Sequence, residues 1–334
     1  MTELTTVRIA AGAGAFNWLP VFVAEELGLF KKQGLQIDYV RLGAVGKATA
    51  AVREGSVDLA ITPPEGAVSD YLNGGSLRVL AANSLRLPMS LVARPGLGDL
   101  RELRGARIGT SSLTEGTALY TRIALRRAGL FYPADYEFVL AGVHTARWLA
   151  LQAGEIDCAP QPAPWNFLAE RSGYHLLSEL SDVIPEVLFA AVIATADWAE
   201  SHRDTVERLL QALAEAHEQV NDPANDQVTH PIYQKITTPE APDLAVRGFT
   251  YTRDMGMWPP GLAVSPAALE ATIDLMTRAD LLAADQRTTA AGVIDSSFLP
   301  ARLRRRPAAI FPARGTREVP PFHLSSCRGK LNDK

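Results

Sequence analysis

Two stretches of this 334-residue sequence combine residue types suited to holding a small ligand. The first is GAGAFNW (12–18), in which glycines let backbone N–H groups approach a ligand closely, while Phe16 and Trp18 offer flat apolar faces. The second is TSSLTEGT (110–117), which places several hydroxyl groups just before an expected helix. Together they predict a site that recognises a small molecule through backbone amides, hydroxyl groups and aromatic rings.

The hydroxyl-rich stretch is the better candidate for binding an acidic group. Ser111, Ser112 and Thr114 precede a helix whose first N–H groups have no partner within the helix, and the helix dipole favours an anion there. Capping by Ser112 or Thr114 would still leave other N–H groups free. The expected ligand loops contain no arginine for a bidentate clamp, so we expect an aromatic or heteroaromatic compound with one acidic group rather than a small dianion.

Further candidates lie where other strands are expected to end. Thr62 and Gln161 are each followed by proline, which stops sheet pairing and turns the chain. Glu65 either pairs with an ammonium group or caps the next helix, and His144 is either a ligand contact or a structural histidine. The expected ligand-binding residues are therefore Phe16, Asn17, Trp18, Gly43, Thr62, Glu65, Asn83, Ser111, Ser112, Thr114, His144, Gln161 and Trp165.

Signals for catalysis and for metal binding are weak. The sequence has no GxSxG elbow, Cys158 has no evident partner, and the six histidines show neither HxxxH nor a neighbouring CxxC. We therefore expect no metal, no cofactor and no assigned catalytic residue. A decarboxylase or isomerase needs only one well-placed acid or base, however, and Glu65, Glu115 or His144 could serve, so an enzyme remains the alternative.

The two ligand stretches belong to an internal repeat. At an offset of 99 positions and without a gap, VRIAAG (7–12) falls on ARIGTS (106–111), and GSVDLAITPP (55–64) falls on GEIDCAPQPA (154–163). The sequence therefore indicates a duplication. Matched pairs in the same register include Arg8 with Arg107, Gly43 with Gly142, Asp58 with Asp157 and Leu77 with Leu176.

Each repeat unit alternates strands and helices. Such alternation implies right-handed crossovers and a parallel sheet, so we expect an α/β fold of two similar Rossmann-like lobes. Ligands of open α/β sheets bind at the carboxyl ends of the strands, which places the cleft between the lobes. Glycines that follow amphipathic stretches should end the helices, and these are Gly28, Gly34, Gly55, Gly129 and Gly154.

The chain should cross between the lobes twice. We expect lobe 1 to comprise residues 1–92 and 190–299, with the C-terminal helices packing back on it, and lobe 2 to comprise 93–189. Two crossing strands would make a hinge that lets the lobes close on a ligand. The Pro- and Arg-rich segment 300–334 has no usable periodicity, and we expect a disordered basic tail.

Composition and charge exclude several classes of protein. The net charge is −4, but residues 300–334 alone carry +7, so the rest of the chain carries about −11, which does not suit a nucleic-acid backbone. No stretch is long and apolar enough to span a membrane. The start, MTELTTVRIA, lacks the features of a secretory signal, so we expect either a cytoplasmic protein or a mature form with an added Met.

The quoted motifs resemble one family. GAFNWLPVFVAEELGLFKKQGLQIDYVRLG, GSVDLAITPP, DLRELRGARIGTSSLTEGTALY and LQAGEIDCAPQPAPWNFLAERSGYHLL are similar to solute-binding proteins of ABC importers, of the NMT1/THI5-like branch for sulfonates, nitrate and thiamine precursors. The likeness covers about residues 7–290. It implies the periplasmic binding protein type II fold, a small-molecule ligand captured by hinge closure, a membrane permease as partner, and a monomer at the periplasmic or outer membrane face.

The same resemblance also admits an enzyme. Cytosolic pyrimidine-precursor synthases, decarboxylases and a desulfinase use this fold, and one of these acting on a small aromatic or heterocyclic acid is our alternative function. The fungal precursor synthase carries a CCCFC iron motif, which the two separated cysteines, Cys158 and Cys327, cannot supply.

Overall fold

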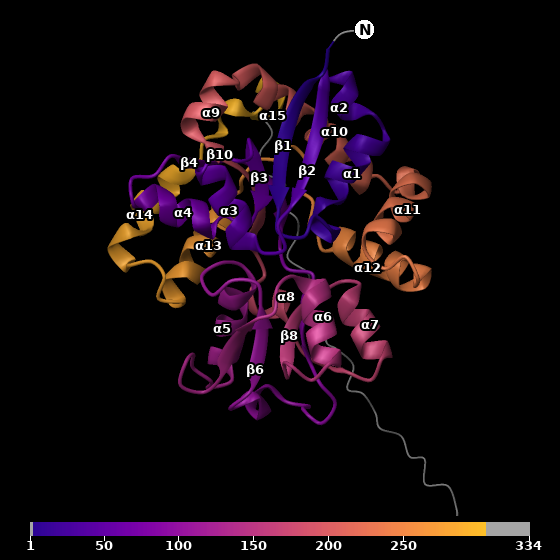
Figure 1. The fold of residues 1–334 in the computed structure, drawn as a ribbon, viewed down its shortest axis with the longest axis vertical. Helices are drawn as coiled ribbons and strands as arrows, with labels where there is room; N and C mark the ends of the chain where they lie inside the picture. The colour runs from indigo at the N-terminus through magenta and orange to yellow at the C-terminus, as the bar shows by residue number, and fades with distance from the viewer. Residues whose placement is uncertain (1–2, 305–334) are drawn as a thin grey trace, which may run out of the picture.

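The computed structural model describes residues 3–304, which form two five-stranded sheets one above the other in Figure 1. The fold class expected from the sequence, two α/β lobes of the periplasmic binding protein type, is confirmed. The first sheet has the order β2 (Leu35–Arg41), β1 (Thr5–Ala11), β3 (Leu59–Thr62), β10 (Leu188–Thr195) and β4 (Leu77–Leu85). The second has the order β7 (Glu137–Leu140), β6 (Arg107–Thr110), β8 (Cys158–Pro162), β5 (Met89–Ala93) and β9 (His175–Glu179).

The pairing of the strands repeats at the offset found in the sequence. In the first sheet β1 pairs in parallel with β2 and β3, with Ile9 opposite Leu59. In the second, β6 pairs in parallel with β7 and β8, with Ile108 opposite Cys158. Both of these pairs are related by 99 positions, so the two lobes share a register as well as an order of elements.

The helices cover both sheets. Those that follow the strands of the first repeat are α1 (Leu19–Glu26), α2 (Leu29–Lys32), α3 (Val45–Arg53) and α4 (Glu65–Leu72). Those of the second are α5 (Thr117–Arg127), α6 (His144–Gln152), α7 (Trp165–Arg171) and α8 (Leu180–Val183). All five glycines predicted to end helices have positive φ. Gly28, with φ 65°, separates α1 from α2 inside a stretch that reads as one helix in the sequence.

The crossings between the sheets fall a few residues from the predicted boundaries. Strand β5, which we expected to end lobe 1, lies in the second sheet, and β10 lies in the first from Leu188 onward. We therefore propose 86–88 and 184–187 as the crossing segments. They run side by side, because Leu85 pairs with Leu188 and the Arg86 N–H donates to the Val187 carbonyl oxygen (3.1 Å).

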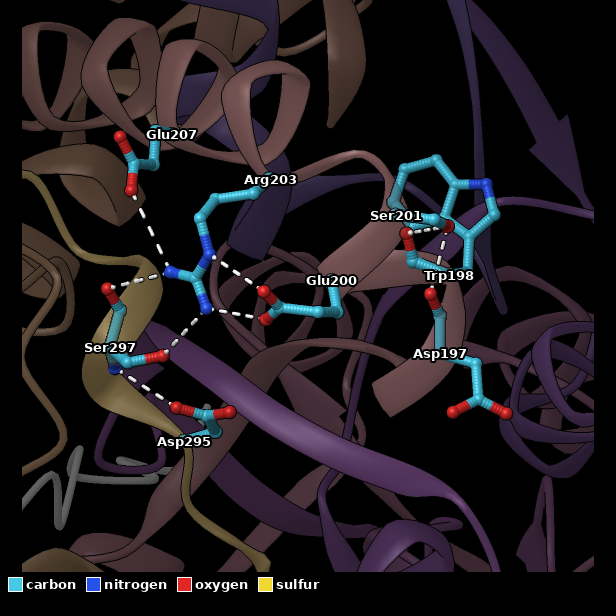
Figure 2. A network of polar contacts seen from close by, with 8 residues as sticks. All are labelled: Asp197, Trp198, Glu200, Ser201, Arg203, Glu207, Asp295 and Ser297. Carbon is cyan, nitrogen blue, oxygen red and sulfur yellow. Dashed lines mark hydrogen bonds and ion pairs between the residues drawn. The ribbon is translucent and has the colours of Figure 1, made fainter.

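The segment before residue 300 is fastened to lobe 1. Ile294 pairs with Val79 of β4, and the 3-10 helix η6 (Ser296–Phe298) follows. Figure 2 shows Arg203, at the start of α10 (Arg203–Asn221), reaching Glu200 (2.5 Å) of α9 (Ala196–Ser201) and the Ser297 carbonyl oxygen (3.3 Å). This network ties the C-terminal return of the chain to the helices behind the first sheet.

Two of the C-terminal helices contact both lobes, which we did not expect. α12 (Pro242–Asp254) approaches α7 through the ion pairs Arg171–Asp243 (3.1 Å) and Arg247–Glu170 (3.3 Å). At the end of α13 (Pro266–Arg278), the carbonyl oxygen of Ala279 accepts a hydrogen bond from Arg122 of α5 (2.9 Å). These helices therefore bridge the two lobes, and Figure 1 shows them on opposite sides of the junction between the two sheets. The remaining helices are α11 (Asp226–Ile236), α14 (Arg287–Ala290) and α15 (Ala301–Arg304).

Within residues 3–304, no helix is long and apolar enough to cross a bilayer. The predicted basic tail, residues 300–334, lies outside the described residues except for 300–304, and Cys327 lies outside them as well.

Candidate functional site

A pocket lies between the two lobes, at the carboxyl ends of the central strands. It has a volume of about 550 Å³, including the solvent at its mouth, and its lining comes from both repeats. The lining consists of Ala11, Gly12, Ala13, Gly14, Phe16, Asn17, Trp18, Val45, Ile61, Pro63, Met89, Ser111, Gly116, Thr117, Val143, His144, Arg147, Pro162 and Phe189.

Lobe 1 supplies aromatic walls. The 3-10 helix η1 (Phe16–Trp18) follows the glycines after β1 and puts all three of its residues in the lining. The Trp18 indole Nε1 donates to the Ile61 carbonyl oxygen (3.1 Å), and the Asn83 amide donates to the Asn17 carbonyl oxygen (2.8 Å). Because these bonds fix the turn, Phe16 and Trp18 present rigid faces to the pocket.

Lobe 2 supplies polar groups. Helix α5 begins at Thr117, and Ser111, Gly116 and Thr117 line the pocket. Helix α6 begins at His144, so the starts of two helices of lobe 2 meet at the same cavity. The positive dipole ends of these helices favour a negative charge in the pocket.

Arg147, one turn into α6, is the residue that the sequence-based prediction missed. Its side chain is 3% exposed; its Nε donates to the Pro160 carbonyl oxygen (3.1 Å) and its Nη1 to the Gly142 carbonyl oxygen (2.9 Å). Within residues 3–304, Nη2 has no hydrogen-bond partner and no carboxylate pairs with the guanidinium. No acidic residue belongs to the pocket lining. The expected ligand loops contain no arginine, but this arginine reaches the pocket from within a helix.

The charges of Arg147 and His144 differ at neutral pH. Burial lowers the pKa of Arg147 to about 9, so this side chain remains a cation. Burial and the adjacent Arg147 charge lower the pKa of His144 to about 3, so its imidazole is neutral. The pocket thus carries one buried positive charge, which is costly without a counter-ion.

Aromatic rings surround His144. Its ring centroid lies 4.0 Å from that of Trp165 and 6.0 Å from that of Phe16, and Phe16 lies 5.8 Å from Phe189. The His144 Nε2 is buried and has no partner within the described residues. A ligand with a planar body could therefore stack on these rings and use the free imidazole nitrogen as a hydrogen-bond partner.

The pocket continues outward into a second, larger space. This outer pocket, of about 1540 Å³ with its open mouth, shares Gly12, Ala13, Gly14, Val143 and His144 with the inner one. Of the predicted residues, Gly43 and Trp165 line only this outer space. Its walls also come from α1 and α11, where Phe22, Ile232 and Ile236 provide apolar surface.

Several predicted residues lie beside the inner pocket without lining it. Thr62 is buried between Ile61 and Pro63, which both line the pocket, and Gln161 is buried next to Pro162, which also lines it. Side chains of a strand alternate between two sides, so Thr62 and Gln161 face away from the pocket. With its amide in the orientation that satisfies both atoms, Gln161 donates to the His144 carbonyl oxygen (3.2 Å) and accepts from the Trp148 N–H (3.1 Å). It therefore orients the start of α6, as Asn83 orients η1.

The remaining candidates also fall outside the inner lining. Ser112 accepts a hydrogen bond from the Thr114 N–H (3.3 Å), and neither residue lines either pocket. Glu65 is fully buried and does not reach the cavity. Burial raises the pKa of the Cys158 thiol well above its usual range, which leaves this cysteine without nucleophilic character.

Two similar lobes with a pocket between the tips of their strands define a binding-protein architecture. The chain belongs to the NMT1/THI5-like family, whose model matches residues 15–225. A provisionally named binding protein of Brucella abortus (strain 2308) is 28% identical over 217 residues, which are 64% of this chain and 66% of that protein. The chain thus aligns with just under two thirds of the length of this relative.

Solved structures of low sequence identity share the fold. A protein from Bordetella bronchiseptica RB50 matches with a TM-score of 0.77 and 18% identity, covering 91% of this chain and 97% of that one. The alkanesulfonate-binding protein SsuA from Xanthomonas axonopodis pv. citri bound to MOPS matches with a TM-score of 0.69 and 17% identity, covering 88% and 99%.

Proposed function

We propose that this protein is the solute-binding component of an ABC-type importer and that it captures a small organic anion between its lobes. The observation that carries the proposal is the buried, unpaired Arg147 in the inner pocket. Membership of the NMT1/THI5-like family and the fold shared with an alkanesulfonate-binding protein support the transport role. In this role the protein works on the outer side of the membrane and presents its ligand to a permease.

The proposed ligand is an aromatic or heterocyclic acid. Its acidic group, a sulfonate or carboxylate, accepts hydrogen bonds from Arg147, Ser111 and the first N–H groups of α5 and α6. Its planar body packs against Phe16 and Trp18, and any further substituent extends past His144 into the outer pocket. Closure of the lobes about segments 86–88 and 184–187 excludes water from the charged contact.

A thermal-shift screen with charge-matched pairs tests the ligand class. Each pair compares an acid with a neutral amide of nearly the same shape, so it separates the effect of charge from that of shape. The pairs are benzenesulfonate and benzenesulfonamide, benzoate and benzamide, and pyrimidine acids and their amides. We expect the anions to raise the melting temperature and the neutral partners to have little effect, and Arg147→Met to abolish the difference. Equal stabilisation by acid and amide, or a full response in Arg147→Met, would contradict the proposal.

The fate of the ligand separates a binding protein from an enzyme. After incubation with the best-stabilising anion, mass spectrometry of the released compound should return it unchanged and in stoichiometric amount. Conversion over many turnovers would instead establish the enzymatic alternative on the same pocket.

A further inference from the structure

A second buried polar cluster lies where the two lobes meet, outside the pocket lining. Glu65 is the first residue of α4 in lobe 1 and is fully buried. Glu115 precedes α5 in lobe 2 and is 8% exposed. The proposed ligand site uses neither side chain, so their burial has no explanation in ligand binding.

The hydrogen bonds of these carboxylates cross from one lobe to the other. The Thr49 hydroxyl of α3 donates to Glu115 Oε2 (3.1 Å), and the Tyr120 hydroxyl of α5 donates to Glu65 Oε1 (3.4 Å). A Cβ atom placed on Gly66 would lie 3.0 Å from Glu115 Oε1, so the lobe-2 carboxylate rests directly on the start of α4. Glu65 Oε2 is buried and has no partner within the described residues.

The surroundings of the pair contain too little positive charge for two carboxylates. The titratable and charged groups that act on it are Tyr120 of α5 and Arg53 of α3, and Arg53 is already paired with Asp70 (2.7 Å). Burial, and then the charge of Glu115, raise the pKa of Glu65 to about 8, while backbone N–H groups of Glu65 and Gly116 oppose the shift. Burial likewise raises the pKa of Glu115. Like charges in one buried site cannot both persist, and a proton on one of them relieves the repulsion.

We propose that Glu65 and Glu115 form a proton-binding site that is assembled when the lobes close, so that the closed form holds a proton that the open form releases. The site rests on the lobe closure of the proposed function. A proton on Glu65 would occupy the partnerless Oε2, leaving Oε1 to accept from Tyr120. Opening separates α4 from Glu115 and returns both carboxylates to water, where they ionise at their ordinary pKa values.

The linkage fixes the direction of the pH effect. The open form loses its proton above its ordinary pKa near 4.5, whereas the closed form keeps it until about pH 8. Between these values each pH unit should lower the closing equilibrium constant by about tenfold, and above pH 8 the dependence should level off. Capture of a ligand is therefore favoured in acidic surroundings and release in alkaline ones.

The test measures the distance between the lobes without any ligand. Spin labels at Lys31→Cys of lobe 1 and Glu155→Cys of lobe 2, both exposed, are introduced with Cys327→Ser, and distance distributions are recorded from pH 5 to pH 9. We expect the short-distance population to shrink as the pH rises in the otherwise native protein. Glu65→Gln should show a much weaker pH dependence, because its neutral amide cannot ionise and only Glu115 is left to titrate.

Matched variants keep the test decisive. Glu54→Gln removes an exposed carboxylate of lobe 1 and should keep the native pH dependence. Glu115→Gln removes the repulsion, so the pH at which the short-distance population stops changing should fall. This variant tests the proposal even if Glu65→Gln fails to fold. A native distance distribution that ignores pH, or an unchanged dependence in Glu65→Gln, overturns the proposal. Failure of the ligand screen leaves this measurement unaffected, so the two proposals can fail separately.

Discussion

Helices α3 and α6 occupy equivalent positions in the two repeats, but α3 contributes apolar residues near the pocket and α6 contributes polar ones. They begin at Val45 and His144, which are 99 positions apart, and both residues line the inner cavity. One turn later α3 carries Ala48, fully buried in the core, where α6 carries Arg147. The two copies therefore share the scaffold and differ in the polar residues at these two positions.

The loops that follow β1 and β6 also differ, with apolar residues in lobe 1 and polar groups in lobe 2. Gly12 and Ser111 are equivalent in the repeat, and both line the cavity. Lobe 1 continues with Phe16 and Trp18, whereas lobe 2 continues with Gly116 and the start of α5. One lobe thus offers the apolar surface and the other the hydrogen-bond donors, which is the division expected for a ligand with a planar body and an acidic end.

The structural part of the repeat remains symmetrical. Arg8 bonds Asp58 (2.7 Å) in lobe 1, and Arg107 bonds Asp157 (3.1 Å) in lobe 2. Each arginine also donates to a backbone carbonyl oxygen in the turn before the third strand. These pairs brace the ends of the strands that lie away from the cleft, so the two lobes are alike where they only have to fold.

The largest effect should come from removing the charge that distinguishes α6 from α3. Arg147→Met should weaken binding of the best-stabilising anion by about 100-fold or more, because a buried, charge-assisted contact is lost. Isothermal titration calorimetry measures the affinity. Arg147→Lys keeps the charge but loses the planar guanidinium, so its affinity should lie between those of the native protein and Arg147→Met. Equal affinities in all three proteins would show that the charge of α6 does not contribute to anion binding.

The next effect concerns the surface where the lobes meet. Because the pKa of Glu65 is raised in the folded state, its contribution to stability is full below about pH 4.5 and is lost as the pH rises through about 8. We expect the free energy of unfolding to fall by roughly 2–4 kcal/mol over this range and Glu65→Gln to flatten that part of the curve. Urea titrations at several pH values measure it, and a curve with the same slope in both proteins would contradict the expectation.

A smaller effect should distinguish the ion pair Arg8–Asp58 of lobe 1 from the ion pair Arg107–Asp157 of lobe 2. Asp157 bonds both Arg107 and Arg94 (2.9 Å), whereas Asp58 bonds one arginine, Arg8, among residues 3–304. Asp157→Asn should therefore cost about 2 kcal/mol of unfolding free energy and Asp58→Asn about 1, since the arginines are half-exposed. Calorimetric melting of the two variants makes the comparison, and equal losses would mean that the second arginine adds nothing.

The unfolding free energy at low pH gives an independent measure of the Arg107–Asp157 ion pair. Although burial opposes it, hydrogen bonding by Arg107 and then Arg94 lowers the pKa of Asp157 to about 2. Its contribution is present above the unfolded value near 3.8 and is lost as the pH falls towards 2. Asp157→Asn should flatten the unfolding free energy between these pH values.

The smallest effect should separate two neighbouring serines of lobe 2. Ser111 lines the pocket, whereas Ser112 only accepts a hydrogen bond from the Thr114 N–H. Ser111→Ala should weaken anion binding by about five- to tenfold, and Ser112→Ala should leave it unchanged. A reversed order would move the anion site towards the surface of the loop.

The sequence was informative about the scaffold because its signals are local. Glycines with positive φ end the helices where expected, and the apolar runs of β4, β5 and β10 lie where strands were predicted. The repeat also implies that the strand pairing of one lobe recurs in the other, and the pairs Ile9–Leu59 and Ile108–Cys158 agree with this. The assignment of β5 to the second sheet could not be predicted, because two apolar strands separated by a short turn pair equally well with either lobe.

The pocket was only partly predictable, for two physical reasons. Strand ends alternate sides, and a shift of one residue puts Ile61 and Pro162 in the lining instead of Thr62 and Gln161. Arg147 lies inside a helix, where a charged residue ordinarily faces solvent. Its only signal was the repeat itself, which aligns it with an alanine in a position that must be buried.

The bridging helices α12 and α13 have a kinetic consequence for the lobe closure that we propose. An opening motion has to separate Arg171 from Asp243 and Arg247 from Glu170 on one flank, and Arg122 from the Ala279 carbonyl oxygen on the other. These contacts are remote from the cavity and half-exposed, so they add little to affinity but resist the first step of dissociation. We therefore predict that these surface ion pairs lengthen the residence time of the proposed ligand and that raising the ionic strength shortens it.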